Sequence, residues 1–263
     1  MFLILFLIAK SIATSIPPLA GIVESIAGPD YKVYSLLRSY QNPHVYELKP
    51  QDIKKAVRSD MYFEIGGHIE AWGNGLRNHV KNPVVITEEF QKRNVNYTNP
   101  HLWLDPQLVP QIAKVVAEKL SQKFPEDSAK FSENYKNFIT RYTALLDTLK
   151  SLFHEHSGKK VLLYHPSWNM LLEYMGLSVA GSMVHHGEKE VSAGEYAKWI
   201  KKIKSENIAI IISEVNMPSK VPQSLASETG ICIAKVDPLF EGDFVDGFKE
   251  QALKIYRALK CQK

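Results

Sequence analysis

Five side chains of the types that bind metal ions follow predicted strands of this chain or close its first half. They are His44, His101, His165, Glu214 and Asp237. In open α/β sheets, ligands bind at the carboxyl ends of the strands. Two of the five residues come from the first half of the chain and three from the second. The pattern therefore predicts a metal site in a cleft between two lobes.

The mixture of residue types indicates which metal such a site would prefer. Three neutral imidazoles and one carboxylate suit tetrahedral zinc, whereas more carboxylates and fewer imidazoles favour manganese. Each histidine of the set has a proline beside it, which restricts the backbone; these are Pro43, Pro100 and Pro166. Four protein ligands leave a tetrahedral ion no open position, so the set favours metal capture over catalysis.

A long helix is the strongest periodic signal between the two groups of residues. From about residue 127 to residue 153, apolar side chains recur at steps of three and four. Such a helix would be roughly 40 Å long, enough to bridge two lobes. Periodicity alone also allows a core helix within one domain. The bridging interpretation is favoured because strands and helices alternate on both sides.

The predicted fold is α/β, with two Rossmann-like lobes whose parallel sheets are joined by the long helix. The apolar run at residues 208–212 is typical of a strand buried on both faces of a parallel sheet. In the first half we expect a helix over residues 70–80, a strand over 83–87 and a polar loop over 91–100. The expected divisions are a partial signal segment 1–9, an N-terminal lobe 10–124, the bridging helix 125–157 and a C-terminal lobe 158–263.

Charge and hydropathy limit the classes of partner. The net charge is only +4 and the lysines are scattered, so nucleic acid is not indicated. Residues 2–9 are apolar, too short to span a bilayer and end at Ala9, which is typical of the end of a secretory signal. No other apolar run approaches about 18 residues, so we expect no membrane span. These features predict an exported protein.

The chain contains two cysteines, Cys232 and Cys261. An exported chain can oxidise such a pair. The sequence does not give the distance between them, so a disulfide and two free thiols are equally open.

Several stretches of the chain closely resemble the metal-binding solute-binding proteins of ABC transporters, in particular the periplasmic zinc-uptake proteins. The stretches occur in the family's order and cover nearly the whole chain, and the most specific is the one that contains His101. They are Ile16-Pro-Pro-Leu19, Asn42-Pro-His-Val-Tyr-Glu47, Ile65-Gly-Gly-His-Ile-Glu70, Asn99-Pro-His-Leu-Trp-Leu-Asp-Pro106, Tyr164-His-Pro-Ser-Trp168, Ser213-Glu-Val215 and Asp237-Pro-Leu239.

This resemblance implies a function and a ligand set. The protein would be periplasmic or otherwise extracytoplasmic, capture Zn²⁺ as a transported ligand and deliver it to an ABC permease, and we expect a monomer without enzymatic activity. His44, His101 and His165 would be ligands and Asp237 the candidate fourth, with Glu214 lining the site. Manganese-binding relatives tend to carry glutamate at the position of His165, which favours zinc.

One departure from the family keeps other metals open. Many zinc-binding members carry a long histidine-rich loop before the second ligand, whereas residues 88–98 contain no histidine. The zinc assignment therefore depends on His165, and Mn²⁺ or Fe²⁺ remain alternatives. The adjacent pair His185 and His186 is either an auxiliary metal site or part of a solvated loop.

Two functions of other classes fit parts of the pattern. A zinc hydrolase could use three histidines and a bound water, with Glu214 as general base. It would need water in place of Asp237, and the chain has no H-E-x-x-H motif. A surface adhesin on the same scaffold would bind a partner protein independently of metal.

Overall fold

The computed structural model describes residues 10–184 and 191–261. The predicted signal segment and the pair His185 and His186 lie outside the described residues. Within the described part, none of the helices is both long and apolar enough to cross a membrane.

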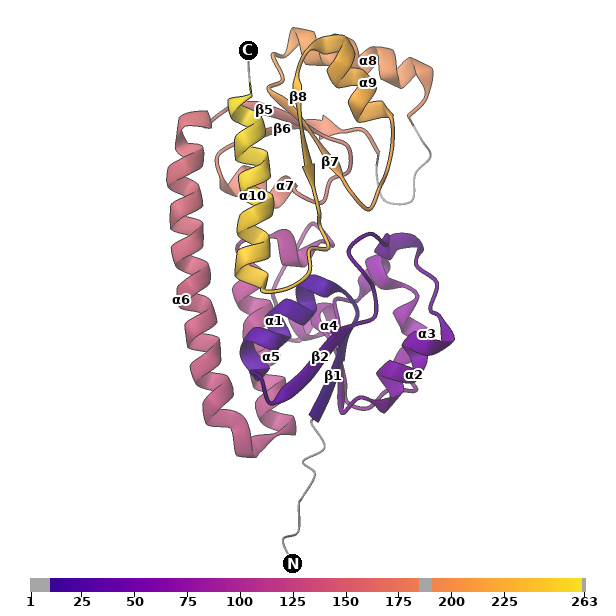
Figure 1. Cartoon of the computed structure of the whole chain (residues 1–263), viewed down its shortest axis with the longest axis vertical. Coiled ribbons are helices and arrows are strands. Elements are labelled where there is room, and N and C mark those ends of the chain that lie inside the picture. The colour runs from indigo at the N-terminus through magenta and orange to yellow at the C-terminus, as the bar shows by residue number, and fades with distance from the viewer. Residues whose placement is uncertain (1–9, 185–190, 262–263) are drawn as a thin grey trace, which may run out of the picture.

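Each lobe contains a parallel sheet of four strands (Figure 1). The strand order is β2-β1-β3-β4 in the N-terminal lobe and β6-β5-β7-β8 in the C-terminal lobe. The strands are β1 (Lys10–Thr14), β2 (Tyr31–Ser35), β3 (Met61–Glu64), β4 (Pro83–Val85), β5 (Lys160–Leu163), β6 (Ser178–Ser182), β7 (Ile210–Glu214) and β8 (Cys232–Val236). All five residues of β7 are buried, as expected for a strand covered by helices on both faces. The predicted α/β class with parallel sheets is confirmed.

Each lobe also contains several helices, most of which lie between consecutive strands of its sheet. In the N-terminal lobe these are α1 (Pro17–Ala27), α2 (Pro50–Arg58), α3 (Gly73–Arg77), α4 (Ile86–Lys92) and α5 (Val109–Lys123). In the C-terminal lobe they are α7 (Asn169–Tyr174), α8 (Ala193–Ser205), α9 (Val221–Thr229) and α10 (Phe244–Lys260). Single 3₁₀ turns occur in the loops, among them η1 (Pro43–Val45), η2 (Gly67–Glu70) and η3 (Leu102–Leu104).

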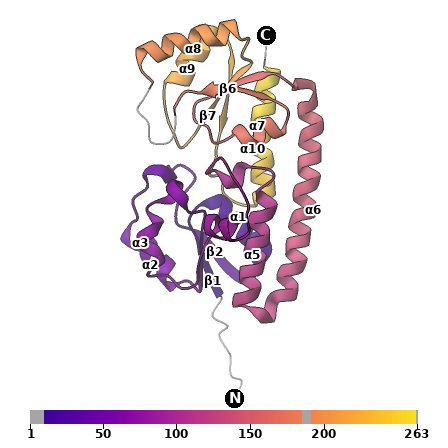
Figure 2. The same ribbon diagram turned by 180° about the vertical axis from the view of Figure 1, so that it is seen from behind.

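The long helix α6 (Ser128–Phe153) runs past both lobes, with α10 beside it (Figures 1 and 2). Near its start, Phe131 meets Tyr31 of β2 edge to face, with ring centroids 5.4 Å apart. Further along, Tyr142 meets Phe248 of α10 at 5.7 Å. One continuous apolar cluster extends from Ile12 in β1 to Leu259 in α10. The two lobes therefore share this core. The C-terminal lobe also has a second buried cluster, the outer cluster, which includes Leu162, Ile203, Ile211 and Leu225.

Two elements of the first half are shorter than predicted. The helix expected over 70–80 is only the five-residue α3, and residue 70 belongs to the turn η2. Two glycines within α3, Gly73 and Gly75, lower its helix propensity. The strand expected over 83–87 stops at Val85, and α4 occupies the next seven residues, including the start of the expected polar loop. The buried side chains Ile86 and Phe90 hold α4 against the core.

The structure joins Cys232 and Cys261 in a disulfide, with their Cα atoms 6.2 Å apart. The bond ties the first residue of the edge strand β8 to the residue that follows α10. Of the two possibilities left open by the sequence, the structure has the bonded one.

Candidate metal centre

Three of the predicted site residues converge between the lobes. His44 lies on η1, His101 directly precedes η3, and His165 follows β5. Their ring centroids are 5.4 Å apart for His44 and His101, 5.3 Å for His44 and His165, and 5.0 Å for His101 and His165. One nitrogen of each ring can be chosen so that all three lie within 4.8 Å of one another. Tetrahedral zinc would separate such nitrogens by about 3.4 Å, so only a small contraction is needed.

Two tight turns of the same type carry His44 and His101. Asn42 Oδ1 accepts the backbone N–H of His44 at 3.0 Å, and Asn99 Oδ1 accepts that of His101 at 2.9 Å. Each turn has the sequence Asn-Pro-His, in which the amide oxygen closes the turn and proline fixes φ of the middle residue. Each histidine is thus held at a defined point of a loop.

Two histidine rings are oriented through Nδ1. Nδ1 of His101 lies 2.8 Å from Asn99 Oδ1, and Nδ1 of His165 lies 3.2 Å from Glu214 Oε1. Because these oxygens only accept, Nδ1 carries the proton and Nε2 is the nitrogen that would coordinate a metal. Ser167 Oγ also donates to Glu214 Oε1. Glu214 is 3% exposed and lines the site beside His165, as expected for a residue that orients a ligand.

Asp237 is placed differently from the three histidines. Its Oδ1 accepts the backbone N–H of Leu239 at 2.9 Å, the same turn geometry that the two asparagines use. Its turn neighbours Pro238 and Leu239 line the cavity, but Asp237 itself does not. Burial raises the pKa of its carboxyl group to about 6. Among the described residues, the structure brings together three of the four predicted ligands.

The cavity at the histidines has a volume of about 10 Å³. This is the space of one water molecule or one ion, far below the 300 Å³ or more of pockets for organic ligands. Its lining comes from both lobes: Asn42, Pro43, His44, His101, Trp103, His165, Glu214, Asn216, Met217, Pro238 and Leu239.

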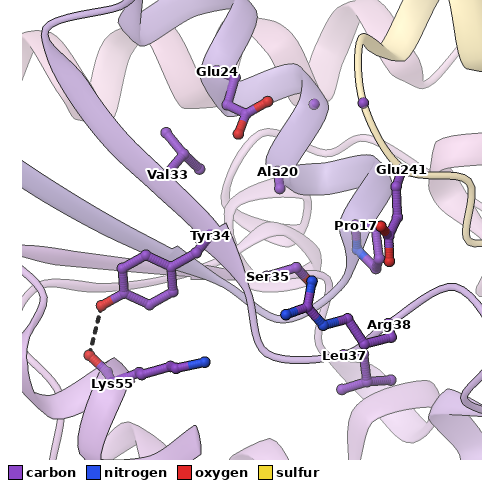
Figure 3. Close-up of a pocket in the computed structure, with 12 residues that line it drawn as sticks. Pro17, Ala20, Glu24, Val33, Tyr34, Ser35, Leu37, Arg38, Lys55 and Glu241 are labelled. Atoms are coloured by element: carbon purple, nitrogen blue, oxygen red, sulfur yellow. Dashed lines mark hydrogen bonds between the residues drawn. The ribbon is translucent and has the colours of Figure 1, made fainter.

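A larger hollow of about 270 Å³ lies between α1, β2 and the loop before α10 (Figure 3). Charged side chains of both signs stand around it, including Arg38 and Glu241. None of the residues that line it is a histidine or a cysteine. Its chemistry therefore differs from that of the histidine cavity.

Sequence reasoning missed residues that support the histidines. Asn99 and Ser167 contact His101 and Glu214 as described above, and Trp72 Nε1 donates to the carbonyl of Pro43 at 3.0 Å. The repetition of Asn-Pro-His was the one available signal for the asparagines, since it implies the same turn twice.

Known proteins of one transport family are similar to this chain. The family model of ZnuA, zinc-uptake complex component A, periplasmic, matches residues 12–258. The zinc-binding protein AdcA of Streptococcus pyogenes is 23% identical over 273 aligned residues, which cover 92% of this chain and 52% of AdcA. The chain thus spans about half the length of that relative.

A second relative carries the name of another metal. The manganese ABC transporter substrate-binding lipoprotein scaA of Streptococcus gordonii is 21% identical over 255 residues, covering 89% of this chain and 79% of that protein. A crystal structure of ZnuA superposes with a TM-score of 0.84 at 26% identity and covers 95% of this chain and 99% of its own. The chain therefore belongs to the ZnuA family of periplasmic metal-binding solute-binding proteins of ABC transporters.

Proposed function

We propose that this protein captures Zn²⁺ and delivers it to an ABC permease. The observation that carries the proposal is the meeting of three imidazole side chains within 4.8 Å in a cavity of ionic size. Imidazole nitrogen is a preferred ligand of zinc, and His44, His101 and His165 are the proposed ligands.

The choice of zinc over manganese depends on the three imidazoles of the close set, which outnumber the one carboxylate that we propose below as the fourth ligand. Manganese sites are richer in carboxylate oxygen. The relatives named above include one zinc-binding and one manganese-binding protein. Manganese is therefore the second candidate metal.

We assign the fourth ligand position to Asp237. Only one of its two oxygens is used by its own turn, and the neighbouring Pro238 already lines the cavity. We propose that this turn moves when the ion binds and that its second oxygen then reaches the ion. The hydrogen bond within the turn can be kept during this movement, because it uses only Oδ1.

A binding function is favoured over hydrolysis by the size of the cavity. A volume of about 10 Å³ holds an ion but no organic substrate beside it. With four protein ligands, the ion would also lack the open position that a catalytic water requires.

Metal content after reconstitution tests this proposal. The chelator-stripped protein is offered equal zinc and manganese and analysed by mass spectrometry, and we expect one equivalent of zinc. Replacement of His165 by alanine should abolish this binding because one of three imidazoles is lost. His79→Ala is the matched control, since His79 is exposed and does not line the histidine cavity. Retention of manganese in place of zinc would contradict the metal assignment, and binding that survives in His165→Ala would contradict the site.

A further inference from the structure

One buried amide side chain, that of Asn99, touches both halves of the metal centre. Asn99 is 8% exposed. Its Oδ1 lies 2.9 Å from the backbone nitrogen and 2.8 Å from Nδ1 of His101. Its Nδ2 donates to the carbonyl of Pro166 at 2.7 Å and to Asn169 Oδ1 at 2.5 Å. Pro166 directly follows His165, and Asn169 begins α7 of the C-terminal lobe.

We propose that Asn99 is a positioning residue that fixes the ring of His101 and ties it to the His165 loop of the opposite lobe. The proposal rests on the metal-binding function proposed above, because it concerns how two of the three ligands are held relative to each other. The two tasks use different atoms of one side chain. Oδ1 holds His101, and Nδ2 holds the loop that follows His165.

The chemistry of the amide group explains why asparagine suits this position. An acceptor oxygen opposite Nδ1 keeps the proton on that nitrogen, so that Nε2 keeps its lone pair for the metal. A carboxylate could accept in the same way, but it has no N–H to donate to the Pro166 carbonyl. Through Asn99, the orientation of the His101 ring therefore depends on the position of the C-terminal lobe.

Asn169 allows the two tasks to be separated. Its Oδ1 contacts Asn99 from the C-terminal lobe, and it is half-buried, so Asn169→Ala weakens the link between lobes without touching His101. Asn134 provides a matched control. It is also half-buried, and its Nδ2 donates to the Ile26 carbonyl at 2.9 Å, away from the histidines.

The test compares the unsubstituted chain with Asn99→Ala, Asn169→Ala and Asn134→Ala. Zinc affinity and dissociation rate are measured by competition with a chromophoric chelator. The tautomer of His101 is measured in the metal-free protein by long-range ¹H–¹⁵N correlation spectra. Because the tautomer is read without metal, it reports ring positioning even if zinc binding fails.

We expect Asn99→Ala to weaken zinc binding about 10- to 100-fold and to give a mixture of His101 tautomers. Asn169→Ala should release zinc several-fold faster with the His101 tautomer unchanged. Asn134→Ala should match the unsubstituted chain in both measurements. If Asn99→Ala fails to fold, Asn169→Ala still tests the link between lobes.

Two results would overturn the inference. Affinity and tautomer in Asn99→Ala equal to those of Asn134→Ala would remove Asn99 as a positioning residue. A dissociation rate in Asn169→Ala equal to that of Asn134→Ala would remove the link between the lobes. Failure of the proposed function can be distinguished from failure of this inference. In that case the unsubstituted chain would bind no zinc, while the His101 tautomers of the variants could still be compared.

Discussion

At the scale of the residue, Asp237 shows that a candidate ligand can already accept a hydrogen bond from a nearby backbone N–H. Residue type and position after β8 mark it as a ligand, yet one oxygen closes the Asp-Pro-Leu turn. Asparagine fills the equivalent turn position at Asn42 and Asn99. Substitution by asparagine should therefore preserve the turn while removing the charge.

We expect Asp237→Asn to fold normally and to bind zinc at least about tenfold more weakly, a loss of about 1.4 kcal/mol. The reason is that a neutral amide oxygen is a poorer ligand than a carboxylate. Chelator competition measures the affinity, and Glu214→Gln serves as the comparison. Unchanged affinity in Asp237→Asn together with a loss in Glu214→Gln would assign the fourth position to Glu214 instead.

A second prediction at the scale of the residue concerns Glu70 and the pH dependence of stability. The side chain is fully buried, and burial together with the nearby charge of Glu64 raises its pKa to about 8. Its Oε2 accepts the backbone N–H of Gly66 at 3.0 Å. Tyr62 and Arg77 also face this pair, and burial raises the pKa of Glu64 as well. The folded protein therefore holds a proton that the unfolded chain releases.

The free energy of unfolding should consequently fall as pH rises from about 5 to 8, by up to about 1.4 kcal/mol per pH unit for one proton. Below the pKa of the unfolded chain, both states are protonated and this dependence vanishes. Glu70→Gln keeps an acceptor for Gly66 and should flatten the slope. Urea unfolding at pH 5.5, 7 and 8 measures it, and equal slopes in both proteins would refute this role of Glu70.

At the scale of the element, contacts between the turns determine how precisely the histidines are held. Trp72, between η2 and α3, donates to the carbonyl of Pro43 in the turn that carries His44. Its ring also meets Tyr46 edge to face at 5.4 Å. Trp103 makes the corresponding hydrogen bond to the Pro238 carbonyl at 2.6 Å. Two indole groups thus fix two of the turns around the cavity.

Trp72→Phe keeps a ring against Tyr46 and removes only the N–H donor. We expect zinc affinity to fall about fivefold, corresponding to the net free energy of one hydrogen bond, about 1 kcal/mol. Trp199→Phe on α8 is the control, because Trp199 packs in the outer cluster of the C-terminal lobe. Equal affinities in the two variants would show that Trp72 serves only in packing.

Sequence patterns predicted the elements whose periodicity is local and the residues that follow strands. The helix α6 and the buried strand β7 could be identified because a repeat of side chains reports directly on burial. The helix α4 could not, because its seven residues are too few to establish a period and its burial is set by the tertiary core. The roles of Asn99 and Asp237 depend on which oxygen meets which N–H, and spacing along the chain does not contain that information.

At the scale of the whole molecule, α6 and α10 restrict how the lobes can move. Both helices pack together, and α1 of the N-terminal lobe contacts both of them. A wide hinge opening would expose part of the shared apolar cluster to water, at a cost of about 25 cal/mol for each Å². We therefore expect metal release to occur by movement of the turns around the histidines, which leaves this cluster buried.

Small-angle scattering should therefore show almost the same radius of gyration with and without zinc, with a change of no more than a few per cent. The metal-free form is prepared with chelator, and loading is verified by metal analysis of the same sample. A large contraction on metal binding would show that the lobes do open. Metal release would then depend on bending or sliding of α6 and not on movement of the turns.

The shared core also has a consequence for cooperativity. The main apolar cluster runs without interruption from β1 to α10, so most of the interior is shared between the lobes, and the C-terminal lobe adds only the smaller outer cluster. The chain should then melt in a single step, and the free energy of metal binding at one small cavity should stabilise both lobes equally. A substitution that weakens packing anywhere along this cluster would lower the population of the metal-binding state, however far it lies from the histidines.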